Sequence, residues 1–166
     1  EIYTLCLHDA LPICYVSSWI KCHHPAAFYC ALLNSQPMGF YSPSQLIQDA
    51  RRHGITIMPV DINSSFYEYS IERDHKGKHG IRMGFVSVRS LNTEKAKSIQ
   101  ILRAENPFSS LKEIIKRTSL TDTDVECLAS ADAFLNIAGD RYKARWQASA
   151  LMPHSELLDD GENEDD

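Results

Sequence analysis

The spacing of helix-starting and helix-ending residues constrains this chain more than any other feature of its sequence. Apolar residues recur every three or four positions in short stretches, and residues that cap or break helices stand at the ends of these stretches. These start and stop signals are Ser42 with Pro43, Gly54, Pro107, Ser109 or Ser110, Thr121 and Gly139. Helices this short are stable only when an apolar face packs on a neighbour. The sequence therefore predicts a mainly α fold of short helices.

Residues 55–85 depart from this pattern and predict a small β element. Apolar residues at Ile55, Ile57, Val60 and Ile62 suit a first strand, and residues 66–71 are rich in aromatic side chains that suit a second. The polar stretch 74–80 carries Gly77 and is typical of a hairpin turn. Residues 81–85 are interpreted as a third strand or as the entry to a helix.

Changes of composition divide the chain into four parts. Residues 1–14 have no clean helical or strand period and resemble a peptide translated from sequencing-adapter DNA, so we expect them to be non-native. Residues 15–83 combine helices, one of them restarting at Pro25, with the β element. Residues 84–151 contain only short helices, the last over 141–151, and residues 152–166 form an acidic tail that we expect to be disordered. Because the chain does not begin with Met, we expect a fragment of a longer protein or a processed product.

Charge is distributed unevenly along the chain. The formal net charge is −5, but seven of the 22 acidic residues lie in 156–166, and all 17 lysines and arginines lie between Lys21 and Arg145. Residues 15–150 carry a net charge of +4, and residues 76–117 carry +7. A basic body with an acidic tail is compatible with a polyanionic partner.

Residues 86–104 have the pattern of a helix-hairpin-helix motif. A short helix is predicted to end at Arg89, a tight hairpin to follow, and a second helix to begin at Thr93. Such a turn presents free backbone N–H groups at the positive end of a helix dipole, which suits one phosphate group without reading a base. Ser90 and Asn92 stand where this hairpin usually has Gly. The alternative interpretation is two packed helices with a solvated basic face.

Other candidate sites are weaker. Residues 110–137 suggest a second hairpin near Leu120, with Lys112, Lys116 and Arg117 on it. Cys22 and His24 are poorly spaced for zinc, and we predict no metal site and no catalytic constellation. Asp61 is interpreted as a turn-forming residue rather than a metal ligand.

The sequence also indicates a compartment. It contains no apolar run of the roughly 18 residues that a membrane span needs. Its five cysteines and the lack of a secretory signal predict reduced thiols and a cytoplasmic location.

Several uncommon blocks resemble bacterial C-family DNA polymerases, which include the alpha subunit of DNA polymerase III. They are LLNSQPMGFYSPSQLIQDARRHG at 32–54, IRMGFVSVRSL at 81–91, PFSSLKEIIKRT at 107–118, ASADAF at 129–134 and GDRYKARWQAS at 139–149. The resemblance covers about residues 15–151 and is strongest to the error-prone branch. It implies the helical end of the fingers domain over 15–83, followed by a helix-hairpin-helix DNA-binding module over 84–151.

The resemblance also implies roles for residues and partners. Arg51 and Arg52 are expected to face the template or the incoming nucleotide. The hairpin residues Ser90, Leu91, Asn92 and Thr93 are expected to hold the backbone of primer–template DNA without sequence preference. Arg89, Lys95 and Lys97 lie near this turn in the sequence and are expected to strengthen the contact. The catalytic palm, its two Mg²⁺ ions and the deoxynucleoside triphosphates belong to the parent enzyme, so this chain alone is not expected to polymerise. Translesion synthesis and damage-induced mutagenesis, with a sliding clamp and other mutagenesis proteins, are expected of the parent.

One alternative does not depend on DNA binding. The short helices could serve as a docking platform for another protein of a mutagenesis complex. The acidic tail and the apolar residues Phe134, Ile137 and Trp146 motivate this interpretation.

Overall fold

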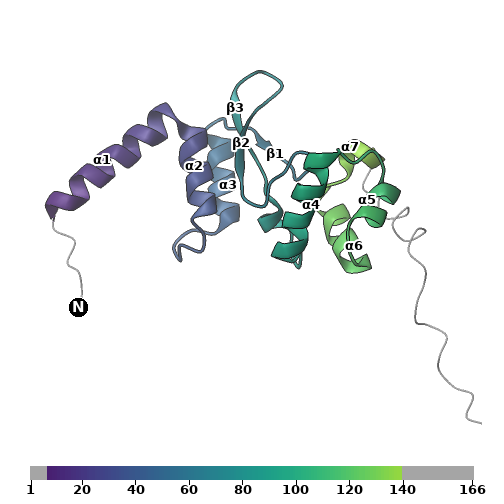
Figure 1. Ribbon diagram of the computed structural model, residues 1–166. Coiled ribbons are helices and arrows are strands. Elements are labelled where there is room, and N and C mark those ends of the chain that lie inside the picture. The colour runs from purple at the N-terminus through teal and green to yellow at the C-terminus, as the bar shows by residue number, and fades with distance from the viewer. Residues whose placement is uncertain (1–6, 140–166) are drawn as a thin grey trace, which may run out of the picture.

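The computed structural model describes residues 7–139, which form seven α-helices, one 3-10 helix and three short strands (Figure 1). In chain order the elements are α1 (Leu7–His23), α2 (Pro25–Asn34), α3 (Pro43–Arg52), β1 (Ile57–Met58), β2 (Ser70–Arg73), β3 (His79–Arg82), η1 (Phe85–Ser87), α4 (Thr93–Glu105), α5 (Leu111–Arg117), α6 (Asp122–Ser130) and α7 (Leu135–Ala138). The predicted mainly α fold with a small β element is confirmed. None of the helices within 7–139 is long and apolar enough to cross a membrane.

Local capping explains where the helices begin and end. Ser42 caps α3 through a capping box with Gln45, and Pro43 occupies the first turn, as the sequence predicts. Ser110 caps α5 and Thr121 caps α6. Gly139, in the left-handed conformation at φ 74°, ends α7. These boundaries depend on neighbouring residues and were therefore predictable.

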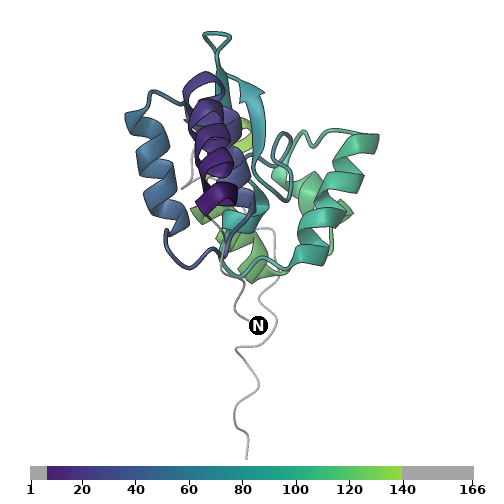
Figure 2. The same ribbon diagram turned by 90° about the vertical axis from the view of Figure 1, so that its left-hand side faces the viewer.

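The sheet joins the two halves of the described chain. Its strand order is β1-β3-β2, with β1 parallel and β2 antiparallel to the central strand β3. The helices α2 and α3 lie on one side of the sheet in Figure 1, and α4 to α7 lie on the other. The view in Figure 2 separates α3 from α4, with α1 and α2 between them.

Each half has its own hydrophobic core. One core contains Tyr29, Ala50 and Ile81 from α2, α3 and β3. The other core contains Val60, Phe85 and Phe134, together with buried residues of α4, α5 and α6. Met83 contacts both cores.

Two asparagine side chains bind backbone segments far away in the chain, and one glycine allows two segments to lie close together. The Asn34 side-chain amide makes two hydrogen bonds of 2.9 Å with the Tyr69 backbone, and Asn63 does the same for Phe108 at 2.8 and 2.9 Å. A Cβ at Gly84 would lie 2.4 Å from the Glu68 carbonyl, so only glycine fits there.

Several predicted boundaries differ from the structure. The second strand covers 70–73 instead of 66–71, because the carbonyls of Phe66 and Tyr67 accept from Phe85 and Val86 outside the sheet. The first helix of the hairpin is a single 3-10 turn that ends at Ser87. Helix α1 begins at Leu7, inside the segment for which no helical period was found. The period was absent because the apolar residues of the α1 sequence are spread around the helix instead of forming one face. The predicted helix over 141–151 and the acidic tail lie outside the described residues.

Candidate nucleic-acid interface

The hairpin before α4 is formed by residues 88–92. Val88 is buried and Leu91 packs on the core, so both anchor the turn. Ser90 between them has φ 63°, a left-handed conformation that glycine adopts far more readily. The sequence pattern suggested glycine at two positions, but the structure has positive φ at only one, because Asn92 is extended and caps α4.

The start of α4 has backbone donors without an acceptor in the described part of the chain. The Asn92 side chain accepts from the Glu94 amide at 2.9 Å. The amides of Thr93 and Lys95 have no acceptor among residues 7–139, as expected in the first turn of a helix. Arg89, Ser90 and Asn92 are exposed around this turn. The arrangement can therefore offer N–H groups and one guanidinium to a single phosphate group.

The predicted contact residues fall into two groups. Arg89 and Lys97 are exposed and have no ion-pair partner among the described residues. Lys95 is instead ion-paired with Asp124 of α6. The Thr93 hydroxyl lies 3.2 Å from the Tyr67 hydroxyl. Lys95 and Thr93 therefore hold α4 against its neighbours, which leaves Arg89 and Lys97 as the free charges.

Asp124 lies at the centre of this packing. Its side chain is only 6% exposed and also accepts from the Thr121 amide at 2.7 Å. Burial by itself raises the pKa of Asp124, but hydrogen bonds from Lys95 and Thr121 outweigh it and lower the pKa below its ordinary value. The carboxylate therefore stays charged and ties α4 to α6.

The second predicted hairpin is present as α5, a turn and α6. Lys112 and Lys116 are exposed on α5. Arg117 instead donates to the Leu102 carbonyl at 2.6 Å and to Glu113 at 2.9 Å, and its guanidinium stacks on Phe108. Arg117 therefore joins α5 to α4.

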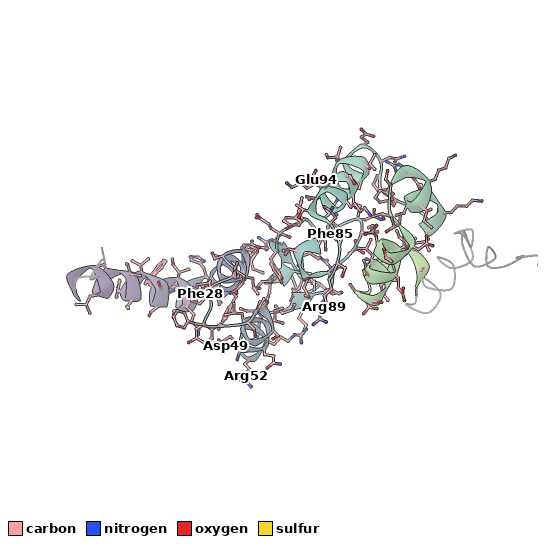
Figure 3. All side chains as sticks on the ribbon, turned by 90° about the horizontal axis from the view of Figure 1, so that it is seen from below. Phe28, Asp49, Arg52, Phe85, Arg89 and Glu94 are labelled. Carbon is pink, nitrogen blue, oxygen red and sulfur yellow. The ribbon has the colours of Figure 1, made fainter. Side chains whose placement is uncertain are left out.

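Arg51 and Arg52 lie at the carboxyl end of α3, away from the α4 hairpin. Both are exposed. Arg52 lines a cavity of about 750 Å³ together with Lys21, whose ammonium is 3.6 Å from the Asp49 carboxylate. In Figure 3, Arg52 and Arg89 project toward the same edge of the view, and Glu94 lies toward the opposite edge. Arg51 and Arg52 therefore belong to α3, and the hairpin residues precede α4. The structure does not join these two groups of residues into one site.

Two weaker hypotheses gain no support from the described residues. No three histidine, cysteine or carboxylate side chains within 7–139 are placed to hold a metal ion, and Cys30 is buried against the Tyr69 carbonyl.

Asp61 accepts from the Asn63 amide at 3.0 Å and from Asn136 at 2.7 Å, which confirms its turn-forming role. Phe134 is 1% exposed, so it is unavailable for docking, and Trp146 lies outside the described residues.

Comparison with known proteins assigns the family. Residues 54–144, more than half of the chain, match the sequence profile described as helix-hairpin-helix motif. The chain belongs to the helix-hairpin-helix motif family. This match covers both hairpins described above, together with the sheet that precedes them.

The chain is also similar to curated proteins named error-prone DNA polymerase. It is 51% identical over 158 residues to the one from Saccharophagus degradans and 51% identical over 150 residues to the one from Teredinibacter turnerae. It is 47% identical over 151 residues to the one from Burkholderia pseudomallei. These alignments cover 88–93% of this chain but only 14–15% of each relative.

Sequence reasoning missed a second basic surface. His23, His24, Lys78 and His79 line one cavity, although they come from the α1–α2 corner and from the turn between β2 and β3. The adjacent histidines and the basic turn were visible in the sequence, but their proximity was not.

Proposed function

We propose that this chain is a segment of an error-prone DNA polymerase in which the hairpin at residues 88–92 holds the sugar-phosphate backbone of duplex DNA. The observation that carries the proposal is the combination of a helix-hairpin-helix match with 47–51% identity to polymerases over most of the chain. The hairpin geometry supports it, because backbone donors without an acceptor among residues 7–139 lie at the start of a 13-residue helix.

The contact is expected to be independent of DNA sequence. Backbone amides and the exposed side chains of Arg89 and Lys97 suit phosphate oxygens, and contacts to phosphate carry no sequence information. Ser90 and Asn92 shape the turn, and Leu91 anchors it. The segment would therefore position primer–template DNA rather than select a sequence.

The chemistry of the parent enzyme would come from outside these residues. Polymerisation of deoxynucleoside triphosphates, with Mg²⁺ as the cofactor, requires carboxylates that the described residues do not bring together. We assign no Mg²⁺ step to this chain, and we expect it to be inactive by itself. Translesion synthesis in damage-induced mutagenesis, a sliding clamp as partner and a cytoplasmic location are part of the proposal for the parent. Arg51 and Arg52 are proposed to approach the template or the incoming nucleotide there.

A salt titration tests the hairpin contact. The full chain is titrated against a fluorescein-labelled 20-base-pair duplex at several salt concentrations, and log affinity should fall linearly with log salt. Changing both Arg89 and Lys97 to Ala should reduce the slope by about 2, because each phosphate contact contributes about 0.9. The control changes Lys112 and Lys116 to Ala, which removes the same charge from exposed positions of α5.

The two variants separate the hairpin from general attraction. An unchanged slope in the Arg89 and Lys97 variant, or an equal loss in the control, would contradict a hairpin contact. Absence of any duplex binding at low salt would contradict the proposed function as a whole.

A further inference from the structure

A second basic surface lies where the β2–β3 turn meets the corner between α1 and α2. In Figures 1 and 2 this turn projects beyond the helices, at the same end of the molecule as that corner. The start of α4 lies toward the other end in Figure 1. The surface is therefore separate from the hairpin of the proposed function.

A cavity of about 390 Å³ opens on this surface, and basic side chains line it. The basic residues that line it are His23, His24, His53, Lys78 and His79. No carboxylate is among the residues of the described chain that line it. The cavity therefore collects potential hydrogen-bond donors for an anion, and the nearest acidic group that contacts one of them is the Asp49 carboxylate beside His53.

The donors on this surface are available for a ligand. The imidazoles of His23, His24 and His79 and the ammonium of Lys78 make no hydrogen bond or ion pair within residues 7–139. An imidazole has an N–H to donate in both of its protonation states. His53 differs, because its Nδ1 is 2.8 Å from the Asp49 carbonyl oxygen and 3.6 Å from the Asp49 carboxylate.

The one carboxylate in the projecting turn is already occupied. Asp74 accepts from the amides of Lys76 and Lys78 at 2.9 Å each, and from the Thr56 hydroxyl at 2.9 Å. These three bonds hold the turn in shape, and hydrogen bonds from Thr56 and from the backbone outweigh burial to lower the pKa of Asp74. The exposed Lys76 and Lys78 therefore project from a fixed turn.

An exposed aromatic ring stands beside this cavity. Trp19 of α1 is 46% exposed, and its ring centre lies 4.5 Å from that of His23 and 5.8 Å from that of His24. Indole rings beside basic grooves suit stacking of unpaired bases, whereas bases in a duplex are already stacked. A concave site with one flat ring thus fits a single strand better than a double helix.

We propose that Trp19 and the basic cavity bind single-stranded DNA, with a base stacked on the indole and a backbone phosphate held by His23, His24, Lys78 and His79. The site does not depend on the α4 hairpin. It would give the chain a contact with an unpaired strand in addition to the duplex contact proposed above.

The test compares two DNA probes on the full chain. The first is a fluorescein-labelled oligothymidine of twelve nucleotides, and the second is the duplex used for the hairpin. Changing Lys78 and His79 to Ala should weaken binding of the single strand about tenfold and leave duplex binding within about twofold. The Arg89 and Lys97 variant should do the reverse, so failure of one proposal is visible apart from failure of the other.

Stacking is tested separately from charge. Trp19→Ala should weaken oligothymidine binding about tenfold, whereas Trp19→Phe should keep most of it because a ring remains. An abasic strand of the same length should bind the wild type about as weakly as oligothymidine binds Trp19→Ala. The Lys78 and His79 positions are exposed, so the double variant should retain the wild-type melting temperature.

Three results would overturn the inference. They are oligothymidine binding that survives loss of Lys78 and His79, equal binding of abasic and thymidine strands to the wild type, and single-strand binding that disappears only with Arg89 and Lys97. The last result would assign both probes to the hairpin.

Discussion

Replacing Ser90 with glycine should stabilise the protein. Ser90 has φ 63°, and its exposed hydroxyl has no hydrogen-bond partner within residues 7–139. A left-handed conformation costs an L-residue about 1–2 kcal/mol, and glycine removes this cost. Glycine also gives the unfolded chain more freedom, which costs about 0.4–1 kcal/mol. The net expectation is a gain of about 0.5–1 kcal/mol in the free energy of unfolding.

A series at this one position isolates the backbone effect. Ser90→Ala keeps the Cβ and removes only the hydroxyl, so stability should change little. Ser90→Val adds a β-branched side chain, which suits a left-handed residue poorly, and should destabilise by about 1 kcal/mol or more. Urea unfolding of the full chain measures all three variants, which should share one denaturant slope. Thermal unfolding should show a rise in melting temperature of about 1–4 °C for Ser90→Gly.

The critical result is the order of stability. Ser90→Gly should be more stable than the wild type, Ser90→Ala should match it, and Ser90→Val should be less stable. If Ser90→Gly lowers stability, or if Ser90→Val is neutral, the left-handed strain assigned to this turn is wrong. A change in the denaturant slope would instead indicate an altered unfolded or native state, and the series would then need to be compared by melting temperature.

Three further predictions concern the packing around the hairpins. Gly84→Ala should cost about 2–3 kcal/mol in urea unfolding, because the new Cβ would lie 2.4 Å from the Glu68 carbonyl; a loss under about 0.5 kcal/mol would contradict this close approach. Asp61→Ala should cost about 2–3 kcal/mol, because the buried carboxylate accepts from Asn63 and Asn136; Asn136→Ala, which removes one of these bonds, should cost less. Glu113 should titrate with a pKa of about 2 by carbon NMR, since hydrogen bonds from Ser109 and Arg117 favour its charged form. Its folded pKa lies below the ordinary 4.5, so its stabilising effect should be complete above that pH and disappear as the pH falls toward 2; Ser109→Ala should raise the pKa, and an unchanged value would contradict the assigned cause.

Local signals predicted much of the fold. The capping residues Ser42, Ser110 and Thr121 and the stop at Gly139 were readable because a cap satisfies amides or carbonyls within its own turn. The second helix of the hairpin, beginning at Thr93, was predicted for the same reason.

The assignment of the charged residues was harder to predict. Arg89 and Lys95 look equivalent in the sequence, yet Lys95 is paired with Asp124, which is 29 positions away in the chain. Arg117 likewise donates to a carbonyl 15 residues earlier. Spacing reports which face of a helix a charge occupies, but it does not report which partner the fold brings to that face.

The sequence by itself determined the mainly α architecture, most helix boundaries, the hairpin before α4 and the excess of positive charge around it. Each of these follows from residues close together in the chain, where backbone conformation and capping act over a few positions. Tertiary structure decided which basic side chains remain free, that Gly84 allows two backbone segments to touch, and that Lys78 and His79 line a cavity together with the histidines of the α1–α2 corner. These depend on contacts between distant segments, because packing of the two cores, and not local propensity, sets the distances between them.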